Sequence, residues 1–324
     1  MSLIQIIEVF NLQIVNLFPN IYFSICHLLT IQNGMIFYEQ IIHMKNISSY
    51  YTGLRTVAEA RSIKLSENTL RKKDNTTNYL KTLGDFTSFT FKIVREIFSP
   101  PIEGREILKQ CYEIGNKSFF LVSITGLIMG LVLTIQSRPV LADFGAESWL
   151  PNMVAVSLIR EIAPVITALI CAGKIGSGIG AELGSMKVTE QIDAMEVSAT
   201  NPIKYLLATR VIATTVMVPI LVFFAIAAGL IGSYFGVNIK GDVSWILFIS
   251  QAFSSVDFLD LIPAIIKSIA FGAIIGLIGC YQGYNSGRGT ESVGKAANSA
   301  VVISSLLVFI IDVIVVQITD AFIK

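Results

Sequence analysis

The sequence predicts an all-α integral membrane protein, with an amphipathic interfacial helix ahead of five transmembrane helices and a short charged helix between spans two and three. Of its 324 residues, 53% are hydrophobic and 15% are charged, which is too little polar surface for a soluble domain of this size. Five apolar stretches each reach the roughly 20 residues that a bilayer requires. One charged stretch, residues 182–202, interrupts them. A multi-span membrane protein is the class that fits all three observations.

Residues 1–82 are expected to form an N-terminal extension. Residues 45–80 are polar and are predicted to be poorly ordered. The more apolar residues before them lack the basic start and the cleavage site of a signal peptide. Three alternatives stay open for them: a weak interfacial segment, a sixth span, or an upstream extension of a chain that starts at Met35 or Met44.

Residues 85–117 are predicted to form two interfacial helices. In the first, four apolar side chains share one helical face: Phe86, Phe89, Ile93 and Ile97. Basic residues occupy the other faces, and Pro100 ends the helix. We expect the apolar face to lie in lipid and the basic residues near anionic headgroups. The alternative is an amphipathic helix that packs on protein.

The five spans are predicted at about residues 118–140, 151–183, 202–237, 259–284 and 296–323. The second and third exceed the length that a bilayer needs, so tilt or bending is expected, with Pro164 and Pro219 as sites for bends.

The charge distribution predicts a cytoplasmic N-terminus. More than half of the 24 Lys and Arg residues lie between Lys45 and Lys117, before the first span. The links that would then face outward, residues 141–150 and 238–258, are acidic and hold both tryptophans at the membrane boundary. An odd number of spans places the C-terminus on the periplasmic side.

The charged stretch between spans two and three contains a short amphipathic helix. Its apolar stripe consists of Val188, Ile192 and Met195, and its acidic face consists of Glu190, Asp193 and Glu196. The segment is too short and too charged to cross a membrane. The pattern suits a docking element for a soluble partner, and equally an ordinary solvated helix.

Among the ionisable residues of the predicted spans, four are candidates for a lipid-binding pocket: Arg160, Glu161, Lys267 and Asp312. Charges at this depth are costly unless they face a cavity or a partner, so they indicate a functional site. Lys267 is a candidate partner for Asp312 or for a lipid phosphate. Lys174 lies near the end of span two, where snorkelling explains it without any function. If span two starts later, Arg160 and Glu161 lie at the outer interface instead.

Glycines at four-residue spacing predict close helix packing. They are Gly176, Gly180 and Gly184 in span two and Gly272 and Gly276 in span four. No phosphate-binding loop of the G-x-x-x-x-G-K-[ST] type occurs, so any ATP hydrolysis is expected from a separate subunit. With two histidines and four scattered cysteines, no metal site, disulfide or bound cofactor is expected.

The segment "REIAPVITALICAGKIGSGIGAELGSMKVTEQIDAMEVSATNPIKYLLATRVIA", Arg160 to Ala213, resembles the signature region of the MlaE-type permeases, the membrane subunits of Mla and Mce lipid-transport ABC transporters. The resemblance continues through "PILVFFAIAAGLIGSYFG" and "GYNSGRGTESVGKAANSAVVISSLLVFIIDVI" and covers about residues 83–324. Lys174 stands where arginine is common in the family. Lysine keeps the charge and loses the forked donor geometry.

The resemblance implies a homodimer whose lipid pocket opens toward periplasmic MCE-domain proteins, with Arg160 and Glu161 near that pocket. It also implies a cytoplasmic coupling helix over residues 186–198 that seats in an ABC ATPase. The residues implied for that contact are Met186, Lys187, Val188, Glu190, Ile192, Asp193, Met195 and Glu196.

The leading hypothesis is therefore a non-enzymatic permease subunit that moves phospholipid or a related lipid between a bacterial inner membrane and a periplasmic carrier. A plastid envelope is the weaker alternative for location, and no nucleic-acid partner is expected. An ion channel or proton-driven motor component is the competing function, with Glu161 and Asp312 as relay groups. An intramembrane protease is disfavoured because the sequence lacks H-E-x-x-H and has no histidine in the spans.

Overall fold

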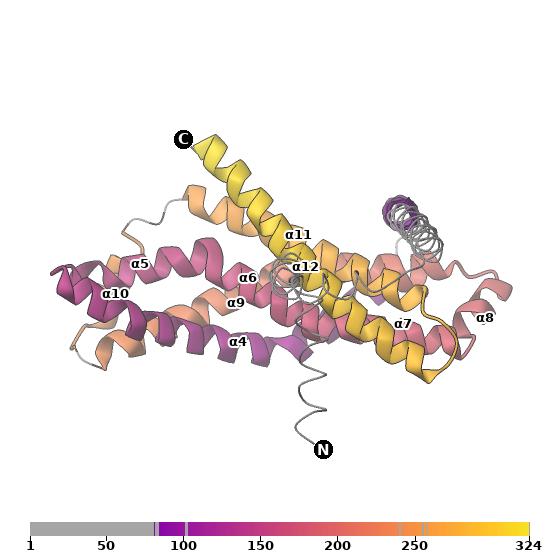
Figure 1. The fold of residues 1–324 in the computed structure, drawn as a ribbon, viewed down its shortest axis with the longest axis horizontal. Helices are drawn as coiled ribbons and strands as arrows, with labels where there is room; N and C mark the ends of the chain where they lie inside the picture. The colour runs from indigo at the N-terminus through magenta and orange to yellow at the C-terminus, as the bar shows by residue number, and fades with distance from the viewer. Residues whose placement is uncertain are drawn as a thin grey trace, which may run out of the picture. The chain divides into compact units, whose positions relative to one another are not determined.

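The computed structural model describes residues 81, 84–100, 103–239, 241–254, 256 and 258–323. The predictions for residues 1–80 lie outside these. All regular structure in the described ranges is helical, and five helices there are long and apolar enough to cross a membrane. The predicted all-α class with five candidate spans is confirmed. These helices run along one another in Figure 1.

Spans one, four and five are single helices: α4 (Gly104–Asp143), α11 (Phe258–Tyr284) and α12 (Thr290–Ile323). Span three consists of a π-helical turn, Ile203–Ala208, and α9 (Thr209–Asn238). Two short helices lie in the links: α8 (Gln191–Val197) and α10 (Trp245–Ala252).

Span two is assembled from several helical pieces over Glu147–Val188. It begins with a 3₁₀ turn, Glu147–Trp149, and continues as α5 (Leu150–Ser157), a π turn (Leu158–Ile162), α6 (Ala163–Cys171), a second π turn (Ala172–Gly176) and α7 (Ser177–Val188). A π turn holds one more residue than an α turn, and such turns occur frequently at functional sites.

Several boundaries differ from those that the sequence suggests. The second interfacial segment, residues 103–117, is continuous with span one, because nothing between Gly104 and Pro139 breaks the helix, and even Pro139 lies within α4. Span two continues beyond residue 183 to Val188. Hydropathy marks where a helix becomes polar, whereas only capping or a breaker marks where it ends.

Two glycine-lined crossings hold the bundle together. Where α4 crosses α9, a Cβ added at Gly126 would lie 2.6 Å from the Ala225 carbonyl oxygen, and one at Gly130 would overlap the Gly229 carbonyl. Where α11 crosses α9, a Cβ at Gly272 would lie 2.6 Å from the Thr214 carbonyl oxygen. Backbones approach this closely only where side chains are absent.

Among the other glycines singled out from sequence, Gly276 is enclosed as tightly, because a Cβ there would overlap the Thr214 hydroxyl. Gly180 has more room, and a Cβ there would meet Ala297 of α12 at 3.3 Å. For Gly176 and Gly184 an added Cβ would make ordinary van der Waals contacts at 3.4 Å or more. Close approach is therefore concentrated at α9, which contacts both α4 and α11.

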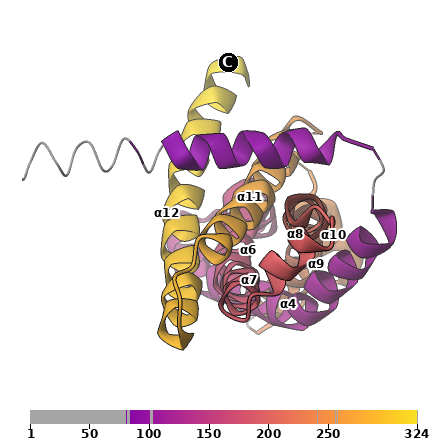
Figure 2. The same ribbon diagram turned by 90° about the vertical axis from the view of Figure 1, so that its right-hand side faces the viewer.

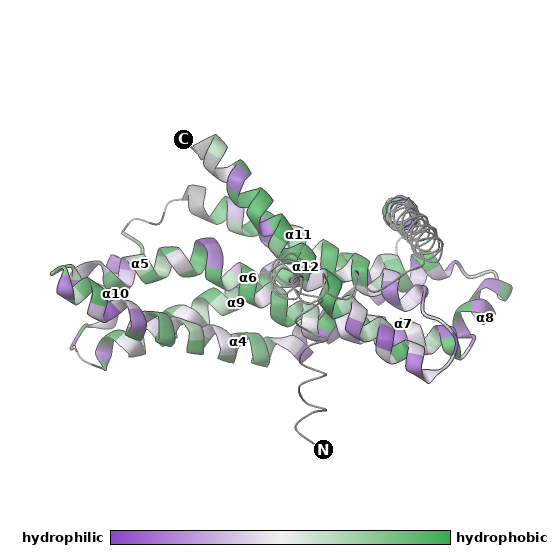
Figure 3. Cartoon of the chain, viewed as in Figure 1, coloured by the Kyte–Doolittle hydropathy of each residue, from purple (hydrophilic) through white to green (hydrophobic). Residues whose placement is uncertain are grey.

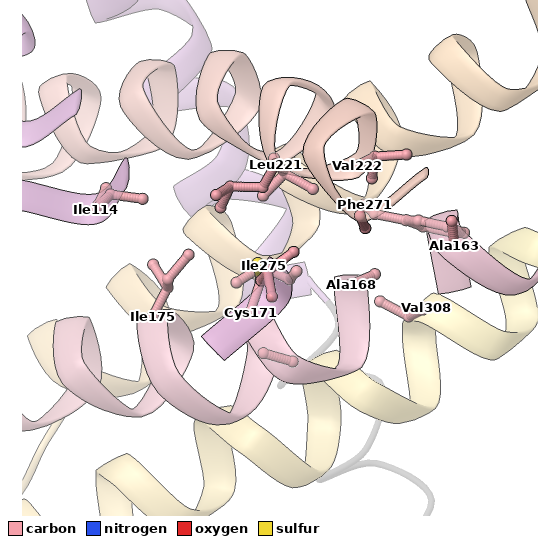
Figure 4. Packing of buried hydrophobic residues seen from close by; sticks show 14 of the residues in the cluster. Ile114, Ala163, Ala168, Cys171, Ile175, Leu221, Val222, Phe271, Ile275 and Val308 are labelled. Atoms are coloured by element: carbon pink, nitrogen blue, oxygen red, sulfur yellow. The ribbon is translucent and has the colours of Figure 1, made fainter. Parts of the chain in front are cut away.

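The core lies where α6, α9 and α11 meet. Its fully buried side chains include Cys171, Leu221, Phe271 and Ile275 (Figure 4). By contrast α12 exposes large apolar side chains along its length, among them Val302, Leu306 and Phe309, and hydrophobic residues dominate its middle in Figure 3. An apolar surface of this kind suits contact with lipid or with another helix.

The helix over residues 84–97 packs on the end of α11 (Figure 2). Phe86 and Phe89 meet the ring of Tyr281 edge-on at centroid distances of 5.2 and 5.3 Å, and Ile93 is buried. This apolar face thus contacts protein, where the sequence analysis expects it to contact lipid. Phe91 and Phe98 are exposed on the same segment.

Candidate functional site

Three of the four predicted intramembrane charges meet at one point. The Nζ atom of Lys267 lies 2.6 Å from Glu161 Oε2 and 2.9 Å from Asp312 Oδ1. The Lys267 side chain is 2% exposed and that of Asp312 is 13% exposed. The Glu161 side chain is 45% exposed, so the cluster opens to the surroundings through this one carboxylate. We call Lys267, Glu161 and Asp312 the charged cluster.

The cluster joins three spans. Glu161 comes from the π turn of span two, Lys267 from α11 and Asp312 from α12. Lys267 Nζ also lies 3.5 Å from the backbone carbonyl oxygen of Arg160, in the same π turn. The Arg160 side chain is exposed beside the cluster. Residues more than 100 positions apart in the sequence are thus held together by one ammonium group.

The balance of charge at this point is unequal. One ammonium faces two carboxylates, so the cluster carries a formal charge of −1 with Lys267 and Asp312 buried. A lysine ammonium has three donors, which is enough to serve both carboxylates and the carbonyl. Of the two carboxylates, Glu161 is the more accessible, so a cationic group, such as an amine, can approach the cluster from its side.

The predicted coupling segment, residues 186–198, has two parts. α7 continues to Val188, and α8 starts at Gln191 after a turn in which Glu190 adopts a left-handed backbone conformation with φ of 57°. An ion pair between Lys187 Nζ and Asp193 Oδ1, at 2.7 Å, ties the end of α7 to α8. Met186, Lys187 and Val188 therefore belong to the last turn of span two.

The apolar stripe of this segment faces the protein. Ile192 is fully buried and Met195 is partly buried, so Ile192 packs within this chain, and its contact with a soluble partner stays a prediction. A seven-residue helix without a buried anchor would not hold its position, which is the physical reason for this outcome. The surface that α8 leaves exposed carries Glu190, Asp193, Glu196 and Val197, and Val197 is 90% exposed.

The family model described as Permease MlaE matches residues 107–318. The chain belongs to the MlaE permease family. A probable ABC transporter permease protein of Rickettsia typhi is 37% identical over 243 residues, covering 75% of this chain and 94% of the relative. The intermembrane phospholipid transport system permease protein MlaE of Haemophilus influenzae is 37% identical over 214 residues, covering 65% of this chain and 82% of the relative.

A further relative has a similar sequence. A probable ABC transporter permease protein of Synechocystis is 35% identical over 221 residues, covering 68% of this chain and 84% of the relative. The permease matches these relatives over most of their length, and the matched region of the family model contains the charged cluster and α8. It is thus an ABC transporter permease of the MlaE type.

The permease holds a second ion pair, between a buried arginine and an exposed glutamate, that was not predicted from the sequence. Arg210 Nη2 donates to Glu182 Oε1 at 2.8 Å and Nη1 donates to the Leu206 carbonyl oxygen at 2.9 Å. The Arg210 side chain is 4% exposed and that of Glu182 is 58% exposed. The feature of the sequence that could have indicated this pair is an arginine near the start of the third span. Its partner lies 28 residues earlier, a separation that helical periodicity does not reveal.

No group of three His, Cys, Asp or Glu side chains is placed to hold a metal ion within the part of the chain that the structure describes. The chemistry available in this part of the permease is the chemistry of its buried ammonium, guanidinium and carboxylate groups.

Proposed function

We propose that the permease is the membrane subunit of an ABC transporter that moves phospholipid between the inner membrane of a bacterium and a periplasmic carrier with an MCE domain. A separate cytoplasmic ATPase drives it, and this chain binds no cofactor of its own. The name of the Haemophilus influenzae relative, an intermembrane phospholipid transport system permease, supports the choice of substrate. The plastid envelope is the less favoured location.

The charged cluster is the observation that carries this proposal. An apolar bundle that keeps a lysine and two carboxylates within its spans, with one carboxylate accessible, suits a ligand with an apolar body and a charged headgroup. Glu161 would accept from a headgroup amine, and Arg160, beside it, would donate to the phosphate. Acyl chains would lie along apolar helix faces outside the cluster.

The proposed assembly is a homodimer with the pocket between the two copies. The exposed apolar side chains of α12 support this, because a helix so exposed in one chain suits a partner helix or lipid. The N-terminus is proposed to be cytoplasmic and the C-terminus periplasmic, following the basic residues ahead of span one. α8 then faces the cytoplasm.

The ATPase is proposed to dock on the exposed side of α8. This surface combines carboxylates with the projecting Val197, and the Lys187–Asp193 ion pair ties it to span two. A force applied to α8 would therefore reach α7 and, through the same continuous span, the π turn that carries Glu161.

The test is co-purification of the detergent-solubilised permease with candidate ABC ATPase subunits. The variant is Glu190→Lys with Val197→Asp, which changes exposed residues and spares the Lys187–Asp193 pair. Asp143→Lys with Phe144→Asp is a matched control, because it makes the same kind of changes at exposed positions after span one. We expect the ATPase to be lost from the first variant and retained by the control.

Two results would count against the proposal. Equal loss from both variants would mean that α8 is not the docking surface. A folded native permease that binds no ATPase would contradict the transporter assignment and favour a channel that uses Glu161 and Asp312 as relay groups.

A further inference from the structure

A second charged site lies between α4 and the end of span two. It is a cavity of about 200 Å³, and its polar lining consists of Gln110, Glu113, Lys117 and Ser118 from α4 and Lys174 and Glu182 from span two. We call it the α4–α7 pocket. None of its lining residues belongs to the charged cluster.

The α4–α7 pocket carries both signs of charge. Lys174 Nζ donates to the backbone carbonyl of Lys117, which holds the two lysines together. Lys117 Nζ pairs with Glu113 Oε2 at 3.1 Å. Each ammonium has three donors, so neither lysine is saturated by the one contact just given. Glu182 is anchored by Arg210 at 2.8 Å while its side chain stays more than half exposed.

Ser118 shows that the pocket wall has unused hydrogen-bonding capacity. The residue is 1% exposed and its Oγ atom has no hydrogen-bond partner among the described residues. Other hydroxyls in the spans bond back to a carbonyl one turn earlier, as Thr134 does to Gly130 at 2.8 Å. A buried hydroxyl without a partner is unfavourable unless something else satisfies it. Ser118 lines the α4–α7 pocket, so a ligand there is the available partner.

We propose that the α4–α7 pocket binds a phosphoamine, a phosphate ester that also carries a primary ammonium group. Lys117 and Lys174 would donate to the phosphate oxygens, and Ser118 would add a neutral donor. Glu113 and Glu182 would accept from the ammonium. The alternation of two ammonium and two carboxylate groups favours a zwitterion over a simple anion, which the carboxylates would repel.

This chemistry has two sources: the headgroup of an aminophospholipid and a soluble phosphoamine. The choice of a lipid as the ligand rests on the proposed function, whereas the proposal that the pocket binds a phosphoamine does not. Glu161 and Lys174 are separated by 13 residues of span two, or roughly 20 Å of helical rise. The α4–α7 pocket is therefore a second binding site for a headgroup, well separated along the span from the charged cluster.

The experiment measures the thermal stability of the detergent-purified permease with three added probes. They are dihexanoyl phosphatidylethanolamine, O-phosphoethanolamine and dihexanoyl phosphatidylglycerol. We expect the first to raise the melting temperature, and the third to do so only at concentrations higher by about tenfold, the factor that one lost charge-assisted contact produces. Stabilisation by O-phosphoethanolamine as well would identify the headgroup alone as sufficient, and stabilisation by the lipid alone would identify lipid as the source.

Ser118→Ala is the decisive variant. Because the hydroxyl has no partner among the residues that the structure describes, its removal should leave the melting temperature of the unliganded permease unchanged or raise it. The same change should raise the concentration of phosphatidylethanolamine for half-maximal stabilisation by about tenfold. Lys117→Gln with Lys174→Gln should have at least this effect. Lys109→Gln, which removes an exposed, ion-paired lysine from the same helix, is the control and should have none.

Three results would overturn the inference: no stabilisation by either phosphoamine, equal stabilisation by phosphatidylglycerol, or full retention of the effect in Ser118→Ala. The failure of this site is distinguishable from the failure of the proposed function. If the permease recruits its ATPase through α8 and shows none of these effects, the proposed function stands and the proposed ligand site is rejected. If it responds to phosphoamines and binds no ATPase, the ligand site stands and the proposed function is rejected.

Discussion

Lys267→Met provides the sharpest test of the charged cluster. The substitution keeps most of the length of the unbranched side chain and removes the only charge that balances Asp312 within hydrogen-bonding distance in the cluster. Asp312 is 13% exposed, so its carboxylate would be left buried without a counter-charge. Breaking a buried pair in this way typically costs about 3–5 kcal/mol, and we expect a loss of unfolding free energy of that size.

A double-mutant cycle separates this effect from lost packing. Asp312→Asn alone leaves Lys267 with Glu161 at 2.6 Å, so it should cost less than Lys267→Met. In the double variant no carboxylate is stranded at residue 312, and its cost should fall below the sum of the single changes by about 1–3 kcal/mol, the range of coupling for residues in contact.

The assay is reversible unfolding of the purified permease in mixed micelles, followed by circular dichroism. The free energies of the native chain, the two single variants and the double variant give the coupling directly. Additive costs, or a larger loss from Asp312→Asn than from Lys267→Met, would show that Lys267 does not hold the cluster together by charge.

The remaining predictions concern helix packing and the second ion pair. Gly130→Ala should lower the unfolding free energy by about 1–3 kcal/mol, because its methyl group would overlap the backbone of α9, and the melting temperature in detergent measures this. Gly294→Ala, in a helical position with open space around it, should raise stability by about 0.5–1 kcal/mol, and a loss there would contradict the packing argument. Arg210→Met should destabilise less than Lys267→Met in the same assay, because the stranded Glu182 side chain is 58% exposed and can be solvated by water. An equal or larger loss would mean that the Arg210 pair is also sealed from solvent.

The fold class and the approximate spans could be predicted from the sequence because both depend on the apolar length that crosses a bilayer. The ends of the helices could not be predicted in this way. α4 starts at Gly104, well before its apolar part, and its polar first turns continue the helix without a breaker. The closest crossing also escaped prediction. Gly126 and Gly130 face glycine- and alanine-containing turns of α9, and this pairing depends on which helices become neighbours.

The charged residues of the candidate site could be predicted one by one, because each is costly in an apolar span. Their assembly could be predicted only in part. Lys267 was a candidate partner of Asp312, whereas its shorter contact with Glu161 depends on how spans two and four pack. The orientation of α8 could not be predicted, because the pattern of a short amphipathic helix does not show whether its apolar stripe faces the protein, as Ile192 does here, or a partner.

The two π turns of span two contribute charged residues to both sites. Arg160 and Glu161 lie in the first turn, and Lys174 lies in the second. A π turn displaces a backbone carbonyl from the regular i to i−4 pattern, and in each turn a side chain donates to a carbonyl. Lys267 approaches the Arg160 carbonyl at 3.5 Å, and the Ser177 hydroxyl donates to the carbonyl of residue 173. The first π turn and the charged cluster therefore share the Lys267 ammonium, so a headgroup that competes for this ammonium would also loosen the backbone of span two.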